Sequence, residues 1–419
     1  MKLTQQERYA FTMILLAVFF RGFVSASYQF QEIVAKKALS AADWQVTLLV
    51  MIWPLSNLLS IWWGKLMERS ASISRYYYIL GFSGRLVLIF MFWVHNWWSY
   101  LLIMLIFFGI NSMQSPAQST LYRYGFGLEN RGRLFGIAAS VENAVVVVFA
   151  WVAGYLLDIN EDWFRHIFAL IGIFGLLSSL FFAQTRITKK VPANLKPVNL
   201  NEFLLGPIRR SIEVLKDNPL FRRFEINYFI YGLAFMMILP VIPKFMVDAV
   251  GMNYSQMFIS KSVIAKLGIL FLAPLAGKLS DLVNPGKFAG ISYFALTLYP
   301  LALFIASFYT SWIYAPYLVM FAFLFNGIAM AGIYVSWNIG SIYFAGPDEA
   351  PMFQSVHVTL TGVRAIFGPL IGFIVMKVFS YQAVFILAAF TFVTAAIFSL
   401  KLGRVIDSLS LSNPQDDYT

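Results

Sequence analysis

The sequence predicts an all-α polytopic membrane protein with twelve transmembrane helices in two six-helix halves. Of its 419 residues, 59% are hydrophobic and 12% are charged, and this charged fraction is about half that of a soluble domain. Apolar stretches of about 18 residues or more recur along the whole chain, and each is long enough to cross a bilayer as a helix. The alternating pattern of a membrane β-barrel is absent from the sequence.

Each of the twelve helices is predicted from one apolar stretch. The predicted ranges are 9–31, 44–66, 76–95, 97–121, 134–157, 163–183, 224–247, 255–279, 288–308, 312–343, 353–378 and 381–402. The first stretch is too long for a signal peptide and lacks a small-residue cleavage site, so we expect a retained first span. The chain has no cysteine, which excludes disulfides and cysteine metal sites.

Basic residues predict the orientation of the chain. With the N-terminus inside, the cytoplasmic loops and the central linker receive most of the 31 Lys and Arg residues. The outer side receives Lys36, Lys37, Arg165, Lys244 and Lys377. This bias predicts cytoplasmic N- and C-termini in a plasma membrane, the bacterial inner membrane being the most consistent choice. It also explains the net charge of +11 without a nucleic-acid partner.

The linker predicted at 184–223 separates an N-terminal six-helix bundle at 1–183 from a C-terminal bundle and short tail at 224–419. Within it, apolar residues recur at helical spacing opposite a basic face. They are Phe203, Leu204, Ile208, Ile212 and Leu215. This pattern is typical of a helix that lies on the membrane surface, and we expect it to tether the two halves.

Short motifs repeat at matching places in the two halves. "GKLMER" (64–69) follows the second predicted span and "GKLSDL" (277–282) follows the eighth. "FAWVAGYLL" (149–157) on the fifth helix matches "FGPLIGFIV" (367–375) on the eleventh. Parallel halves of this kind place a substrate site near the membrane midplane.

These motifs resemble those of the major facilitator superfamily. The repeated Gly-Lys-Leu-x-acidic segment is similar to that family's signature loop, although Ala71 stands where the family has a glycine. The "GPLIG" segment resembles the glycine and proline motif that the family places on its fifth helix. The resemblance implies a monomer of two bundles that moves a small solute by alternating access, driven by an ion gradient or by exchange. No Walker loop is present, and we expect no cofactor.

The repeated loops are the predicted gating elements. Gly64 and Gly277 would permit close helix approach, while Glu68 and Asp281 are acidic residues on a basic face. We expect these carboxylates to bond opposing helix ends when the inner side is closed. The full predicted set is Gly64, Glu68, Arg69, Arg75, Gly277, Asp281 and Lys287.

Charged residues inside the predicted spans indicate the substrate class. They are Arg21, Arg85, Glu142, Lys261, Lys266 and Arg364. An unpaired charge costs at least about 2.5–3.5 kcal/mol at the bilayer centre, so such residues are functional candidates. Because five of the six are positive, the sequence predicts an anionic organic substrate.

Arg21 is the first candidate for a substrate contact, because the resemblance places helices one, four, seven and ten around the cavity. A guanidinium grips a carboxylate or phosphate at two points. Arg364 is expected either to bind substrate or to brace the interface between helices. Glu142 and Lys266 lie on helices that the resemblance makes neighbours, so we hypothesise a coupling pair between the halves, with Glu142 a candidate carrier of H⁺.

Polar and aromatic residues on the helices that would line the cavity complete the predicted substrate site. They are Asn111, Gln114, Gln118, Tyr228, Tyr231, Asn326, Trp337 and Asn338. Aromatic side chains offer an apolar wall with one hydrogen-bonding edge. His357 and Arg85 are expected to be packing residues, and the three histidines predict no metal cluster.

Two other functions remain open on the sequence alone. The many aromatic residues would also suit an exporter of amphipathic or drug-like compounds or lipids. A membrane receptor that transports nothing is the alternative of a different class. An enzyme is excluded, because no nucleophile–base or metal constellation occurs in the sequence.

Overall fold

The computed structural model describes residues 3–68, 70–187, 200–345 and 350–412, and this part of the chain is helical without a β-strand. Twelve of the described helical stretches are long and apolar enough to cross a membrane. They are Gln5–Lys37, Asp43–Met67, Ser74–Trp93, Trp97–Gly125, Leu134–Ile159, Trp163–Ala183, Pro219–Ala249, Tyr254–Leu272, Pro285–Ala306, Ala315–Trp337, Met352–Val378 and Tyr381–Leu409. The twelve predicted spans are therefore confirmed, with boundaries that differ by several residues.

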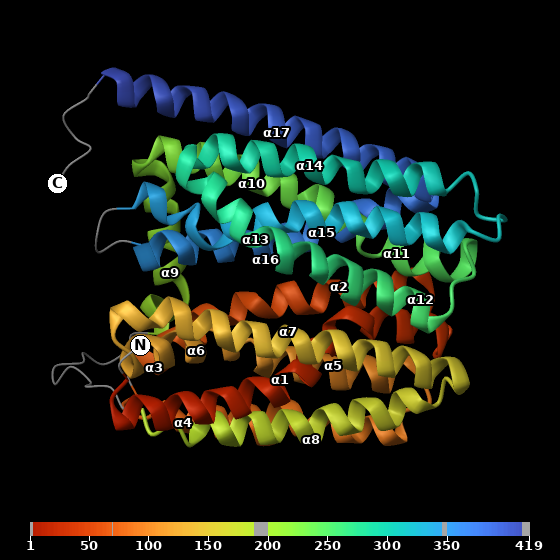
Figure 1. Ribbon diagram of the computed structural model, residues 1–419, viewed down its shortest axis with the longest axis horizontal. Helices are drawn as coiled ribbons and strands as arrows, with labels where there is room; N and C mark the ends of the chain where they lie inside the picture. The colour runs from red at the N-terminus through yellow and green to blue at the C-terminus, as the bar shows by residue number, and fades with distance from the viewer. Residues whose placement is uncertain (1–2, 69, 188–199, 346–349, 413–419) are drawn as a thin grey trace. The chain divides into compact units, whose positions relative to one another are not determined.

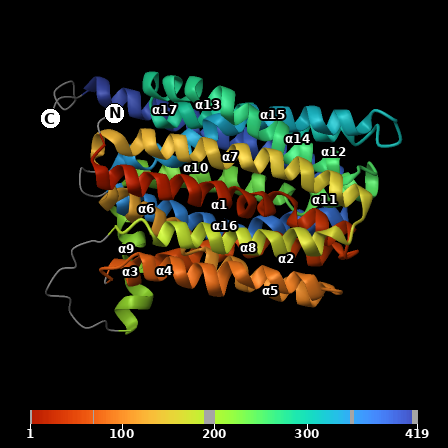
Figure 2. The same ribbon diagram turned by 60° about the horizontal axis from the view of Figure 1, so that its bottom comes forward.

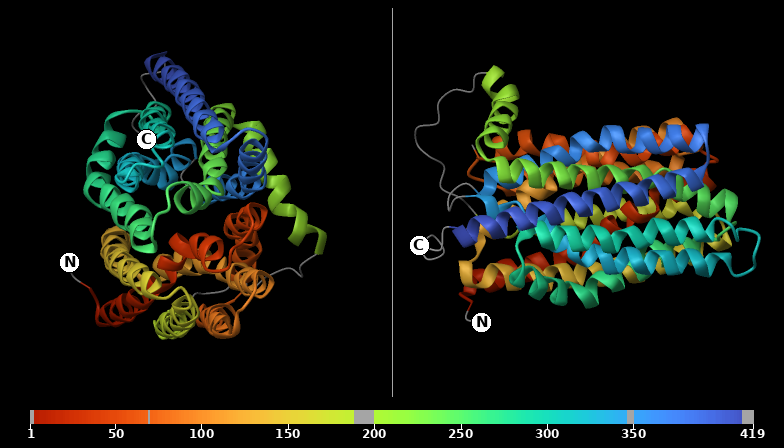
Figure 3. Two further views of the ribbon diagram at one scale, coloured as in Figure 1. Left: turned by 90° about the vertical axis from the view of Figure 1, so that its right-hand side faces the viewer. Right: turned by 90° about the horizontal axis from the view of Figure 1, so that it is seen from above.

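The helices, which are labelled in Figure 1, form two compact units. Unit 1 comprises Met1–Pro207 with Asn253–Phe258, and unit 2 comprises Ile208–Met252 with Ile259–Thr419. The left view of Figure 3 looks nearly along the helices and shows that they run side by side within each unit. Part of the predicted linker, 188–199, lies outside the described residues, and its boundaries stay a prediction.

The first six spans belong to unit 1, and several are built from more than one helix. Their elements are α1 (Gln5–Lys37), α2 (Asp43–Ser56), η1 (Asn57–Leu59), α3 (Ser60–Glu68), α4 (Ser74–Ile79), η2 (Leu80–Arg85), η3 (Leu86–Trp93), α5 (Trp97–Asn111), α6 (Gln114–Gly125), α7 (Leu128–Ile159) and α8 (Trp163–Ala183). Helix α9 (Leu200–Asp217) follows in the chain.

The last six spans follow α9. Their elements are α10 (Pro219–Ile238), α11 (Val241–Lys244), η4 (Phe245–Ala249), α12 (Tyr254–Phe258), η5 (Ile259–Ile264), α13 (Ala265–Leu282), α14 (Pro285–Ala306), α15 (Ala315–Ile339), η6 (Ile342–Phe344), α16 (Ala350–Val378) and α17 (Tyr381–Ser412). Helix α12 belongs to unit 1, where it packs against α7.

Proline explains where two of the spans break. A proline removes one helical hydrogen bond and its ring clashes with the carbonyl four residues earlier. The fourth span is interrupted after Asn111, four to five residues before Pro116. The seventh span is interrupted after Ile238, where Pro240 and Pro243 follow. The third span instead contains a π-helix, η2, a feature often found at functional sites.

Glycines set the closest helix approaches in each unit. In unit 1, α1 lies between α7 and α8 (Figure 2). A Cβ added at Gly22 of α1 would lie 2.5 Å from Cβ of Val145 on α7. In unit 2, Gly372 of the "GPLIG" segment lies against the carbonyl of Met237 on α10, where an added Cβ would come within 2.1 Å of the oxygen. This segment therefore holds α16 close to α10.

The stretch expected to lie on the membrane surface forms helix α9. Its side chains at Leu205, Ile208 and Ile212 are exposed apolar groups three or four residues apart. This exposed stripe fits the expected contact with the membrane surface, which stays a prediction.

Replacing Gly22 by alanine should destabilise the protein by about 1–3 kcal/mol, because the added methyl group overfills the contact between α1 and α7. Thermal unfolding of the purified protein in detergent measures the effect. Gly109→Ala on α5 is the matched control, since an added Cβ there meets no described atom within 4 Å. Equal unfolding temperatures for the two variants would contradict the packing argument.

Candidate functional site

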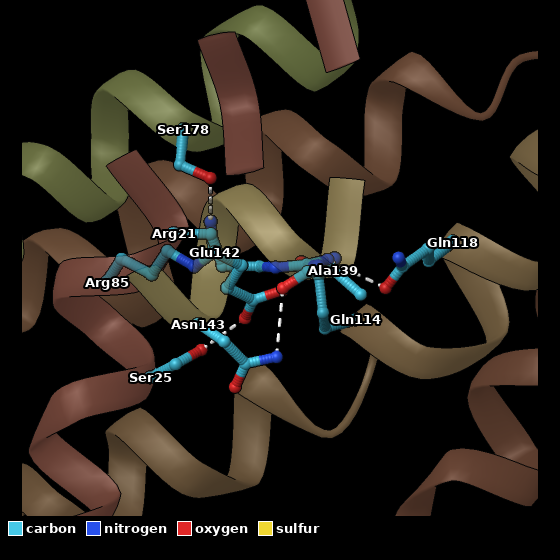
Figure 4. A network of polar contacts seen from close by, with 9 residues as sticks. All are labelled: Arg21, Ser25, Arg85, Gln114, Gln118, Ala139, Glu142, Asn143 and Ser178. Carbon is cyan, nitrogen blue, oxygen red and sulfur yellow. Dashed lines mark hydrogen bonds and ion pairs between the residues drawn. The ribbon is translucent and has the colours of Figure 1, made fainter. Parts of the chain in front are cut away.

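A charged network lies inside unit 1 and joins α1 to α7 (Figure 4). Arg21 of α1 is 8% exposed, and its Nη2 forms an ion pair with Glu142 of α7. Its Nη1 donates to Oε1 of Gln118 at 2.7 Å, while the Ser25 hydroxyl donates to Glu142 at 2.5 Å. The close contact at Gly22, one residue after Arg21, is what brings the two helices near enough for this pairing.

Arg85 occupies a second, fully buried position in unit 1, at the end of the π-helix η2. Every described hydrogen-bond acceptor around its guanidinium is neutral. They are Asn111 (3.3 Å), the carbonyl of Gly175 (3.2 Å), Ser178 and Ser179 (3.0 Å each) and Gln114 (2.7 Å). These bonds offset the cost of burying the cation. Gly175 makes the space, because a Cβ there would lie 2.8 Å from Cβ of Arg85.

Arg85 therefore fixes the broken fourth span. Its partners Asn111 and Gln114 flank the interruption between α5 and α6, and Asn111 also donates to the hydroxyl of Tyr28 on α1. Of the predicted substrate contacts in unit 1, the structure thus brings Arg21 together with Gln118, and Asn111 together with Gln114. The partners of both arginines were not evident from the sequence.

Unit 2 holds a different arginine site, built around Arg364 of α16. This side chain is 5% exposed and its Nη1 donates to the carbonyl of Tyr228 at 2.9 Å. Its Cζ lies 5.3, 5.6 and 5.8 Å from the ring centroids of Tyr228, Tyr231 and Trp337, distances at which a cation is attracted to an aromatic ring. Its Nε is buried without a hydrogen-bond partner among the described residues. A Cβ at Gly232 would lie 2.1 Å from Nη1, so this glycine leaves the space for the guanidinium.

A buried pair of a carboxylate and an imidazole lies on α10 and α16. Nδ1 of His357 is 2.8 Å from Oε1 of Glu225, and the two residues are 1% and 2% exposed. Sequence reasoning missed Glu225 because it is the second residue of the predicted seventh span, where charged side chains ordinarily reach the interface. His357 was expected only to be a packing residue. A search of the sequence for an acidic residue near the start of one span and a histidine near the start of another could have found this pair.

The remaining predicted substrate residues and the predicted coupling pair lie on α7, α13 and α15. Asn326 of α15 is 8% exposed, and the side chain of Asn338 lies outside the described residues. Lys266 is half-buried on α13 in unit 2, whereas Glu142 is paired with Arg21 inside unit 1. The hypothesised pair of Glu142 with Lys266 stays a prediction.

The predicted gating residues lie at helix ends rather than in long loops. Arg75 is exposed on α4, and Asp281 is exposed at the end of α13. Lys287 forms an ion pair with Asp407 of α17, inside unit 2. The side chain of Glu68 and all of Arg69 lie outside the described residues.

The glycines of these segments are not at tight contacts within their own units. A Cβ at Gly64 would meet Pro116 at 3.9 Å, an ordinary van der Waals distance. A Cβ at Gly277 would meet no described atom of unit 2 within 4 Å. The close approach predicted for them is therefore not made inside either unit. Among the described residues, no group of three His, Asp or Glu side chains could hold a metal ion.

Twelve apolar helices in two bundles, each with charged side chains buried inside it, define an integral membrane protein. The family model of the Major Facilitator Superfamily matches residues 10–338 and 226–415, so the chain belongs to that family. Members of the family bind and transport small molecules and are not enzymes.

Individual proteins are similar to this chain over nearly its whole length. "Multidrug resistance protein MdtG" of Dickeya zeae (strain Ech586) is 24% identical over 371 residues, covering 86% of this chain and 85% of the relative. The structure of the nucleoside transporter NupG has a TM-score of 0.74 at 14% identity, covering 95% of this chain and 100% of that one. A POT family transporter in complex with a thioalcohol conjugated peptide has a TM-score of 0.70 at 13% identity, covering 94% and 96%. These structures confirm the predicted fold.

Replacing Glu142 by glutamine should destabilise the protein by about 3–5 kcal/mol, because Arg21 would stay buried without its ionised partner. The double variant Arg21→Met with Glu142→Gln should recover part of this loss, since it leaves no unpaired charge. Thermal unfolding in detergent of the two single variants and the double variant measures the coupling.

The ion pair of Arg165 with the exposed Asp162 supplies the control. Asp162→Asn should change stability by less than about 1 kcal/mol. Additive effects of the two changes at Arg21 and Glu142 would show that the pair does not contribute to folding.

Proposed function

We propose that this protein is a secondary active transporter that moves a small organic anion by alternating access, driven by an ion gradient or by exchange. The observation that carries the proposal is Arg364, a buried cation with no carboxylate partner among the described residues. Its guanidinium keeps unused donors, and such a group in an apolar bundle is best satisfied by an anionic ligand.

Arg364 is a better substrate contact than Arg21. The charge of Arg21 is already balanced by Glu142, and two of its nitrogens have partners. Arg85 is saturated by neutral acceptors. Arg364 has one backbone carbonyl and three aromatic rings around it. The rings of Tyr228, Tyr231 and Trp337 would hold the apolar part of an organic anion while the guanidinium binds its charged end.

Replacing Arg364 by glutamine should weaken binding of an organic anion by about 10- to 150-fold, the value of one hydrogen bond to a charged group. Arg364→Lys should recover only part of the affinity, because an ammonium lacks the two-point grip of a guanidinium. A thermal-shift screen of the purified protein with benzoate, phenylphosphonate, neutral benzamide and cationic tetraphenylphosphonium identifies binders, which are then tested for uptake into proteoliposomes.

The exposed Lys401 on α17 supplies the matched control, and Lys401→Gln should leave binding unchanged. Stabilisation by tetraphenylphosphonium alone, with Arg364→Gln indistinguishable from the wild type, would refute the anionic substrate.

The second candidate is an exporter of amphipathic or drug-like compounds. The name of the relative from Dickeya zeae and the aromatic wall around Arg364 favour it. In that case transport of cationic drugs should survive neutralisation of Arg21 and of Arg364 in separate variants. The alternative of a receptor that transports nothing is not supported, because the chain belongs to a transporter family.

We further propose that the protein is a monomer in the bacterial inner membrane with both termini in the cytoplasm. The basic residues of the predicted cytoplasmic segments support this orientation. In this orientation Glu68 and Asp281 lie at the inner side, where we propose that they act as a latch in the closed state.

Replacing Glu68 by glutamine should shift the protein towards its inward-open state, because the latch loses a charge-assisted bond to an opposing helix end. Single cysteines placed on the cytoplasmic side of this cysteine-free chain should then react faster with a water-soluble maleimide. Glu213→Gln on α9 is the control for a loss of one cytoplasmic carboxylate. Equal labelling rates in both variants would rule out the latch.

A further inference from the structure

The pair formed by Glu225 and His357 has the means to bind one more proton. Nδ1 of the imidazole lies 2.8 Å from Oε1 and 3.1 Å from Oε2 of Glu225. Towards an ionised carboxylate, which only accepts hydrogen bonds, this nitrogen is the donor. Nε2 of His357 is buried and has no hydrogen-bond partner among the described residues. In the neutral imidazole, this nitrogen holds a free lone pair.

Aromatic rings enclose the other sides of the imidazole. The ring centroid of His357 lies 4.4 Å from that of Tyr228 and 4.5 Å from that of Trp337. The ring of Phe224 is 6.5 Å away. An aromatic ring attracts a cation within about 6 Å of its centroid, a distance that Tyr228 and Trp337 meet. An imidazolium would therefore be stabilised by the carboxylate on one side and by the rings on the others.

The fixed charges around this pair balance one another. Arg364, two helical turns farther along α16, donates to the carbonyl of Tyr228, which follows Glu225 by one turn on α10. The guanidinium and the carboxylate therefore belong to one cluster with no net charge when His357 is neutral. Histidine is the side chain whose ordinary charge change falls between pH 5 and 8.

The other titratable groups on the helices packed against this cluster are phenols or lie at the surface. From α10 and α14 come the phenols of Tyr228, Tyr231 and Tyr293. On α17, Lys401 and Arg404 are exposed, and Asp407 is paired with Lys287. The described part of α15 contributes Trp337, and its two phenols, Tyr317 and Tyr334, are exposed. Among the described groups of the cluster, His357 is thus the one with a ring nitrogen that is free to accept a proton.

We propose that Glu225 and His357 form the binding site of the coupling proton, and that this proton gives the Arg364 cluster the positive charge with which it holds an anion. The proton binds the lone pair of Nε2, no other bond changes, and the cluster goes from neutral to a charge of +1. An anion bound at Arg364 restores neutrality, so proton and anion cross together. This inference rests on the anionic substrate proposed above. It moves the proton from Glu142, which is engaged by Arg21, to the C-terminal half of the chain.

The indole of Trp337 offers a direct readout, because a protonated imidazole quenches the fluorescence of a neighbouring indole. The purified wild-type protein is titrated from about pH 8 to pH 5, and the signal of Trp337 is the difference from the Trp337→Phe variant. We expect the Trp337 signal to fall in a single one-proton transition. His357→Gln should abolish the transition, while Lys401→Gln should leave it unchanged. A transition that persists in His357→Gln, or none in the wild type, would overturn the proton site.

If the His357→Gln variant does not fold, Glu225→Gln provides a second test. The amide keeps a hydrogen bond to Nδ1 but removes the negative charge, so the transition should move to lower pH. If the pair only braces α10 against α16, the variant loses thermal stability and the transition stays where it was. An unmoved transition would therefore refute the proposal.

Adding an anion separates this inference from the proposed function. Binding of benzoate or phenylphosphonate at Arg364 should favour the protonated pair, and linkage then moves the transition to higher pH. Neutral benzamide is the control and should not move it. A transition that depends on His357 but responds to neither anion would leave the proton site standing and refute the anionic substrate. A transition that responds to the anions but does not depend on His357 would refute the proton site and leave the anionic substrate standing.

Discussion

The cost of placing a charged side chain in an apolar bundle is the constraint on which the rest of this structure depends. Each buried arginine must find enough acceptors, because water is not available inside the bundle to replace them. Arg21 meets the demand with an ion pair and Arg85 with neutral acceptors. Arg364 meets it only in part, with one carbonyl and three aromatic rings. The three solutions imply three different roles.

Glycines make these solutions possible. A guanidinium needs a space the size of a small side chain, and each buried arginine has a glycine at or beside that space. Gly175 leaves room for the stem of Arg85, and Gly232 leaves room for the guanidinium of Arg364. Gly22 instead has no side chain, which lets α7 approach α1 closely enough for Glu142 to pair with Arg21. The positions of the buried charges therefore depend on the positions of the glycines.

The sequence was sufficient for the fold. Apolar stretches of membrane-spanning length predict the twelve spans directly, because length and hydropathy are local properties of the chain. The repeated motifs predict the two halves in the same local way. The charges well inside the spans were also identified, since a charge in the middle of an apolar stretch is conspicuous.

The partners of those charges could not be predicted, because partners depend on how the helices rotate and pack. Arg85 was expected only to be a packing residue, yet it is fully buried and its guanidinium donates to three other elements. Glu225 was overlooked because its place near the start of a span suggests contact with the interface. Only the packing of α10 against α16 reveals that it faces His357. Geometry of this kind is set by glycine contacts between helices that are far apart in the sequence.

The two units therefore use buried charge in opposite ways. In unit 1, Arg21 has a carboxylate partner and Arg85 has acceptors for each of its nitrogens, although Nε of Arg21 has no partner among the described residues. Such networks rigidify a bundle and specify its packing. In unit 2, Nε of Arg364 and Nε2 of His357 are buried without partners among the described residues. Unsatisfied buried groups are rare in native proteins, and each calls for an explanation. The cluster also holds the unpartnered hydroxyls of Tyr228 and Tyr293, but Arg364 and His357 differ from these in being a fixed cation and a base. The proposed anion and proton would bind these two groups in turn and leave no lasting charge in the bundle.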